Sequence, residues 1–127
     1  MQRWAKYNHI TLGCYPDALA NTAVLRLSEF KPQHLSNTAW SFAKMNHKAP
    51  SLFDVIASAA KERIDDFNPQ ALSNAAWSFA TLNHEAPSLF DAIATAAQER
   101  IGDFNPQALA NTAWAIRQDE SQGTSSV

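Results

Sequence analysis

FNPQALSNAAWSFATLNHEAPSLFDAIATAAQERIGD, residues 67–103, decides the fold, because the stretch directly before it is the same unit written again. Residues 30–66 match it at 27 of 37 positions without a gap, and a third copy opens at Phe104 as FNPQALANTAWAI. A period in this range is typical of stacked repeat proteins, in which each unit buries its apolar surface against its neighbours. The sequence therefore predicts a helical-repeat array.

Each unit has the pattern of two helices. Asn68 can cap the first helix, Pro69 suits its first turn, and Asn83 suits the left-handed conformation that ends many helices. The second helix is expected to begin at Pro87 and to be stopped by Gly102. We expect an all-α fold, an α-solenoid of stacked antiparallel helix pairs with a 37-residue period. Helices are predicted over residues 33–45, 50–64, 70–82, 87–101 and 107–117.

The repeats divide the chain into one array over residues 1–117 and a tail. The array holds a partial unit 1–29, full units 30–66 and 67–103, and a partial unit 104–117. Trp4–His9 aligns with Phe42–His47, so the stretch 10–29 takes the place of a second helix. A rival alignment makes residues 17–23 a first helix, and we reject it because no room for a second helix remains before Phe30. Residues 118–127 are polar and unpatterned, which predicts a disordered tail.

Composition narrows the class of protein. The net charge is −2, with residues 1–66 carrying five Lys, three Arg and six acids, and residues 67–127 carrying two Arg and six acids. Contacts with a polyanion should therefore concentrate on the first half. The single cysteine, Cys14, excludes an internal disulfide and a cysteine-rich zinc site. No apolar run reaches about 18 residues, so no membrane contact is predicted, and no secretory or transit peptide is visible at the start.

The residues that could carry chemistry do not form a catalytic pattern. His9, His47 and His84 recur one unit apart, which places them about 10 Å from one another in a stack, too far to share a zinc ion. Three widely separated glycines cannot form a phosphate-binding loop. We expect no enzyme activity, no cofactor, no metal and no small-molecule substrate.

A polar stripe on the first helices is the candidate binding surface. Its predicted residues are Asn37, Ser41, Lys44, Asn74, Ser78, Thr81, Asn111 and Gln118. With the repeats stacked in register, these residues would form parallel polar rungs suited to a linear ligand. The repeated Asn would be a common anchor, and positions 44, 81 and 118, which differ between units, would carry any preference for particular bases. Trp40, Trp77 and Trp114 border the stripe and either stack on a ligand or belong to the core.

The motif F-x-P-Q-x-L-[SA]-N-[TA]-A-W-[SA]-[FI], present at Phe30–Phe42, Phe67–Phe79 and Phe104–Ile116, resembles the first helix of the octotricopeptide repeat family and its heptatricopeptide relative. The resemblance implies an α-solenoid in a chloroplast or mitochondrion that acts in organellar RNA processing, stability or translation. It leads to the main hypothesis, an RNA-binding helical-repeat protein that holds single-stranded RNA along the first-helix face. The alternative is a protein-interaction scaffold that binds an extended peptide or a partner subunit on the same face.

Overall fold

In a computed structural model, the chain is all-α over the residues that the structure describes, which are 15–125, with the side chains of 17–120. The α-helices are α2 (Tyr15–Leu25), α3 (Pro32–Lys44), α4 (Pro50–Glu62), α5 (Pro69–Thr81), α6 (Pro87–Glu99) and α7 (Pro106–Ser125). Short 3-10 turns follow the second helices: η1 (Leu27–Glu29), η2 (Ile64–Asp66) and η3 (Ile101–Asp103). The all-α prediction is confirmed, and no strand occurs within 15–125.

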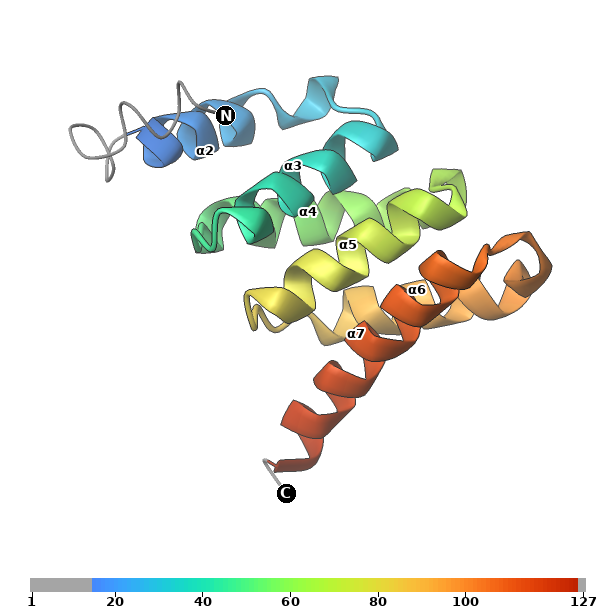
Figure 1. The fold of residues 1–127 in the computed structure, drawn as a ribbon. Helices are drawn as coiled ribbons and strands as arrows, with labels where there is room; N and C mark the ends of the chain where they lie inside the picture. The colour runs from blue at the N-terminus through green and yellow to red at the C-terminus, as the bar shows by residue number, and fades with distance from the viewer. Residues whose placement is uncertain (1–14, 126–127) are drawn as a thin grey trace.

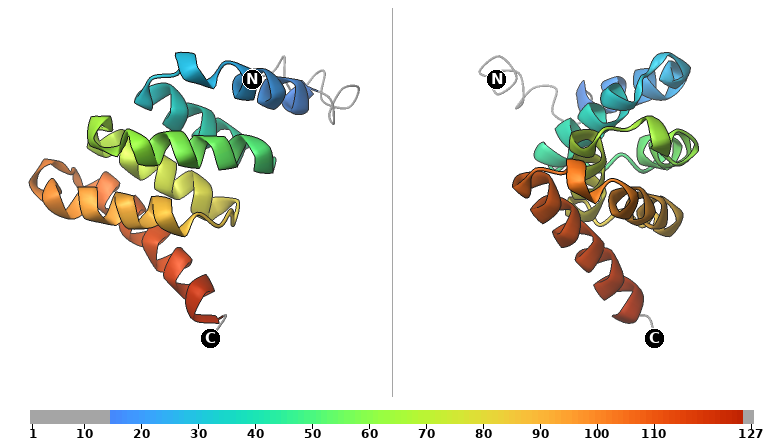
Figure 2. Two further views of the ribbon diagram at one scale, coloured as in Figure 1. Left: turned by 180° about the vertical axis from the view of Figure 1, so that it is seen from behind. Right: turned by 90° about the vertical axis from the view of Figure 1, so that its right-hand side faces the viewer.

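The helices lie in two layers. α3, α5 and α7 contact one another in sequence and form the first-helix layer, whereas α2, α4 and α6 form the second-helix layer. Figure 1 looks onto the first-helix layer, and the left view of Figure 2 looks onto α4 and α6 from behind. α3, α5 and α7 begin 37 residues apart, each at a proline.

The ends of the first helices follow the predicted capping chemistry. The Asn68 side chain accepts a hydrogen bond from the Ala71 backbone N–H at 2.7 Å, and Asn105 does the same for Ala108 at 2.7 Å. At the other end, Asn83 has a φ of 55° and the N–H of His84 donates to the Phe79 carbonyl at 3.0 Å. This is the Schellman arrangement, in which a left-handed residue closes the helix and turns the chain toward the second helix.

The second helices are shorter than predicted. Both complete ones end at a glutamate, Glu62 and Glu99, and a 3-10 turn follows in each. The expectation that Gly102 stops α6 is wrong, because α4 ends at the equivalent position with Asp65 in place of the glycine. Gly102 has no positive φ. In the preceding unit, the guanidinium of Arg63 donates a hydrogen bond to the Phe30 carbonyl at 2.6 Å. This bond links the η2 turn to the start of its own unit.

α2 lies in the second-helix layer against α4, where a second helix belongs, so the rival alignment of residues 17–23 as a first helix is wrong. Its equivalence with α4 holds at side-chain level, because Asp17 and Asp54 make the same contact to a histidine thirty residues ahead. The predicted partner helix segment in residues 4–9 lies outside the described residues.

The predicted disordered tail is the largest error in the sequence-based model. α7 continues past residue 117 to Ser125, so the tail prediction is wrong for 118–125, while 126–127 lie outside the described residues. The reason is the loss of a stop signal. Asn46 and Asn83 end α3 and α5 in the left-handed conformation, and Glu120 stands at the equivalent position of the third unit. Glutamate favours the helix, no proline follows, and an established helix propagates readily.

Small residues fill the contacts within the first-helix layer. Counting 100° per residue, Ser36, Ala39 and Ala43 of α3 face Ala75 and Ser78 of α5, and all five are buried. The next contact repeats this with Ser73, Ala76 and Ala80 of α5 against Thr112 and Ala115 of α7, again all buried. Large apolar side chains lie between the two layers instead, where Phe53 and Phe79 have ring centroids 4.8 Å apart.

Phe79→Ala should destabilise the whole chain. Phe79 is fully buried between the layers and its ring also lies 5.6 Å from that of His84, so its removal loses transfer energy and leaves a cavity. We expect a loss of about 3–5 kcal/mol in the free energy of unfolding, measured by urea denaturation followed by circular dichroism. The control is Leu25→Ala, at a side chain that is 84% exposed, which should change it by less than about 0.5 kcal/mol. Equal effects of the two substitutions would contradict the packing.

Asp119→Asn should stabilise the chain in a pH-dependent way. Partial burial raises the pKa of the Asp119 carboxyl above its ordinary value, and the charges of Asp91, Glu120 and Glu85 raise it further. Because the folded-state pKa is the higher one, stability falls as pH rises from the ordinary pKa through the raised one. The variant should therefore melt at a higher temperature than the parent at about pH 7, and the gain should vanish below about pH 3.9, the ordinary value for Asp. Asp65→Asn, at an exposed carboxylate, is the control.

Candidate functional site

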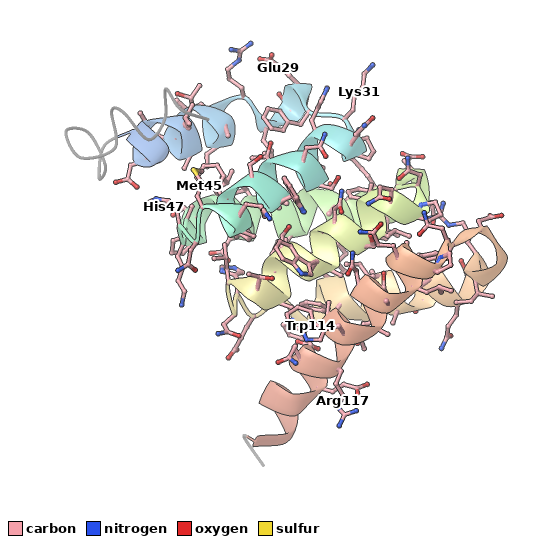
Figure 3. The ribbon with its side chains drawn as sticks, viewed as in Figure 1. Glu29, Lys31, Met45, His47, Trp114 and Arg117 are labelled. Atoms are coloured by element: carbon pink, nitrogen blue, oxygen red, sulfur yellow. The ribbon has the colours of Figure 1, made fainter. Side chains whose placement is uncertain are left out.

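The outer surface of α3, α5 and α7 carries the same four positions in each helix, and we name it the first-helix face. Its residues are Gln33, Asn37, Trp40 and Lys44 of α3, Gln70, Asn74, Trp77 and Thr81 of α5, and Gln107, Asn111, Trp114 and Gln118 of α7. Within each helix they span an arc of about 60° at 100° per residue. None of the twelve is buried. Figure 3 looks onto this face and labels Trp114.

Aromatic rings and amides contact one another along the face. The ring centroids of Trp40 and Trp77 are 6.4 Å apart with an interplanar angle of 37°, so neighbouring helices share one aromatic platform. The Lys44 amine lies 5.2 Å from the Trp40 ring centroid, within the range of a cation–π interaction. On α5, the Gln70 amide donates to the Asn74 side-chain oxygen at 3.1 Å. This bond uses the Asn74 side-chain oxygen as its acceptor, and the Asn74 amino group is a donor.

The face combines two kinds of recognition chemistry. Asn and Gln amides each offer two donors and one acceptor group, and can bond to base edges or to a peptide backbone. Exposed indoles offer flat surfaces on which bases of any sequence can stack. Lys44 is the only charged residue among the twelve. The arrangement therefore suits a ligand held mainly by stacking and neutral hydrogen bonds, with its strongest charge contact at the α3 end.

Six of the eight predicted site residues lie on this face. They are Asn37, Lys44, Asn74, Thr81, Asn111 and Gln118. Asn37 and Lys44 on α3 are exposed, and the four on α5 and α7 are half-buried. Their placement on one layer follows from the equal spacing of the repeats, while their role in binding stays a prediction.

The two predicted serines do not belong to the face. Ser78 is fully buried, and its hydroxyl donates to the Asn74 carbonyl at 2.6 Å, so it cannot meet a ligand. It lies in the small-residue contact between α3 and α5, about 40° around the helix from Asn74. Ser41 is the equivalent residue on α3 and is exposed, because it lines a groove on the side of α3 away from α5. The predicted stripe on α5 was therefore centred too close to the side of the helix that packs against α3.

The sequence left open whether the three tryptophans lie on the surface or in the core, and their exposed fractions decide this. Trp40 is 40% exposed, Trp114 is 43% exposed, and Trp77 between them is half-buried. The interpretation as core is therefore wrong for Trp40 and Trp114, whereas Trp77 packs partly against the core. The glutamines at the start of the face, Gln33, Gln70 and Gln107, were missed as site residues. Their identity in all three copies, four residues before each Asn, was the available signal.

Two histidine–aspartate pairs fix the loops that end the first helices. Nε2 of His47 lies 3.0 Å from Oδ1 of Asp17, and Nε2 of His84 lies 2.8 Å from Oδ1 of Asp54. Each pair joins the loop of one unit to the second helix of the preceding unit. The recurring histidines have a structural partner here. Within the described part of the chain, no group of three or more metal-ligating side chains could hold a metal ion.

No helix among the described residues combines the length and apolar character needed to cross a membrane.

Comparison with known proteins gives one family match. The family model described as "FAST kinase-like protein, subdomain 1" matches residues 35–93, which run from α3 into α6. Over this part the chain is similar to a family of helical, RNA-associated proteins. No octotricopeptide family model matches. None of the curated proteins and none of the solved structures matches the chain.

Proposed function

We propose that this chain is an α-solenoid of stacked helix pairs with a 37-residue period, and that it holds single-stranded RNA along the first-helix face. The observation that carries the proposal is the row of partly exposed indoles, Trp40, Trp77 and Trp114, set beside amides on three consecutive helices. Stacking on aromatic side chains is the common means of binding single-stranded nucleic acid. The match to an RNA-associated helical family over residues 35–93 supports the same ligand.

We assign a role to each position of the repeat. The indoles stack on bases, and the tilted pair Trp40–Trp77 offers a continuous platform from α3 to α5. The repeated Asn provides a common hydrogen bond, and the fourth position, which is Lys44, Thr81 or Gln118, differs between units and carries any base preference. The ligand thus runs across the helices, one unit after another. By the octotricopeptide resemblance, we place this activity in the processing, stability or translation of RNA in a chloroplast or mitochondrion.

We propose no catalytic role for this face. Its side chains are amides, indoles, one hydroxyl and one amine, and no carboxylate stands among them to hold Mg²⁺ for phosphoryl transfer. The word kinase-like in the matching family's description is therefore not extended to this part of the chain.

An extended peptide or a partner subunit is the second candidate ligand for the same face. The charge of residues 67–127 favours it, because two Arg against six acids give this half a net charge of −4, which repels phosphates. The amides of α5 and α7 can bond to a peptide backbone as they can to a base. Failure to bind short single-stranded RNA at low salt, together with binding of an extended peptide, would favour this candidate.

Lys44→Ala should weaken RNA binding and flatten its salt dependence. Each phosphate contact to a single strand contributes a slope of about 0.7 in log affinity against log salt, so the variant should lose roughly that much or less. The measurement is fluorescence anisotropy with short unstructured RNAs at two salt concentrations. Lys61→Ala is the matched control, since it removes the same charge from α4 in the second-helix layer. An equal change in slope for both variants would mean that the lysines act through net charge and that α3 does not contact the phosphates.

A further inference from the structure

A groove runs between α4 and α6 on the second-helix layer, which the left view of Figure 2 shows from behind. It consists of two adjoining cavities of about 440 and 270 Å³, and Lys61 and Ser88 line both of them. On one side the lining continues from α4 into η2, and on the other it follows α6 from Ala86 to Glu99. The groove therefore lies between the two complete units.

The shape of this groove belongs to the repeat. Another cavity of about 270 Å³ lies between α2 and α4. Each residue that lines the smaller α4–α6 cavity has its equivalent, 37 positions earlier, in the lining of the α2–α4 cavity. The charges differ, because Glu85 stands in place of Lys48 and Lys61 in place of Val24. Stacked second helices thus leave the same kind of cavity twice, and its charge is particular to α4 and α6.

The rim of the α4–α6 groove is acidic. Four carboxylates and one amine give its lining a net charge of −3: Asp65, Glu85, Asp91, Glu99 and Lys61. All five residues are exposed, and within the described part of the chain none of the four carboxylates forms a salt bridge.

The charges of the groove also act on α7. Burial raises the pKa of the Asp119 carboxyl, and the charges of Asp91, Glu120 and Glu85 raise it further. Two of these three charges, Asp91 and Glu85, line the groove. The potential around the groove is therefore negative.

Small side chains line the space between the carboxylates. Ala96 is 4% exposed, and Ala57 and Ala92 are half-buried. Such a surface suits the stems of long cationic side chains, which lie along apolar atoms while their charged ends reach the rim. The hydroxyls of Ser88 and Thr95, both exposed in the lining, can bond to a peptide backbone.

We infer that this groove binds a basic segment of a partner protein in an extended conformation, with arginine or lysine side chains paired to Asp65, Asp91 and Glu99. Charge complementarity selects this occupant, because the same carboxylates repel the phosphates of a nucleic acid. From Ala86 to Glu99 the helix rises about 20 Å, which an extended segment of about six residues can span. The inference concerns the layer opposite the first-helix face and does not depend on the RNA proposal.

Fluorescence anisotropy with a labelled hexapeptide of alternating arginine and serine, at low salt and without RNA, tests the inference. The parent chain should bind this peptide and should not bind the matching peptide of alternating glutamate and serine. Asp65→Asn should weaken binding about two- to fivefold, because an exposed ion pair is lost. Asp66→Asn is the matched control, since it neutralises the next carboxylate of η2, which is also exposed but lies outside the groove lining. It should leave the affinity unchanged, and Lys61→Ala should strengthen binding.

Filling the groove separates its shape from its charge. Ala92→Leu should weaken binding of the arginine peptide at least as much as Asp65→Asn does, without a change in charge. Gln98→Leu, at an exposed residue of α6 outside the lining, is its control, and circular dichroism should show all variants equally helical.

A parent chain that does not bind the arginine peptide at low salt overturns the inference. Equal effects of Asp65→Asn and Asp66→Asn also overturn it, because the peptide would then respond to net charge and not to the groove. So does a folded Ala92→Leu variant that binds the peptide as tightly as the parent.

Discussion

The close contact between successive first helices is the constraint on which the rest of the structure depends. Ser, Ala and one Thr occupy both sides of the α3–α5 and α5–α7 contacts, and every one of these side chains is buried. The distance between packed helices depends on the side chains at the contact, so such small residues bring the helices near the short end of the range. An indole cannot enter so narrow a space. The outer surface therefore carries the indoles, beside the amides: Trp40, Trp77 and Trp114. The close packing of the first helices thus produces the candidate binding face.

The same repeat also determines where the first helices end. Each complete first helix closes on a left-handed Asn, and each following His is paired with an aspartate of the preceding unit. In the third unit Glu120 replaces the Asn, so α7 continues as a straight helix and its carboxylates gather near Asp91. One substituted stop signal therefore changes the length of α7 and the charge around Asp119.

The helix pairs and most helix ends could be predicted from the sequence, because the same pattern recurs in successive units. The 37-residue identity predicts the helix pairs, and capping residues such as Asn68 and Asn83 place the helix ends within two residues. The rotation of each first helix about its own axis, which decides the side chains that face solvent, was harder to predict. Ser78 is polar, and periodicity alone does not separate a small buried hydroxyl, which bonds its own helix backbone, from an exposed one. Trp40 and Trp114 are large and apolar, and periodicity alone left open whether they belong to the core or to the surface, where the structure places them. The extension of α7 was readable in Glu120 but needed comparison with Asn83, position by position.

The most direct test of the account is to map where RNA touches the chain. Short single-stranded RNAs that carry 4-thiouridine can be photocrosslinked to the full chain, and the adducts located by mass spectrometry. The account predicts crosslinks on α3 and α5 at Trp40, Trp77 and their neighbouring amides, with few on α4 and α6. Crosslinks concentrated on the second-helix layer, or none above the level of a noncognate protein, would contradict it.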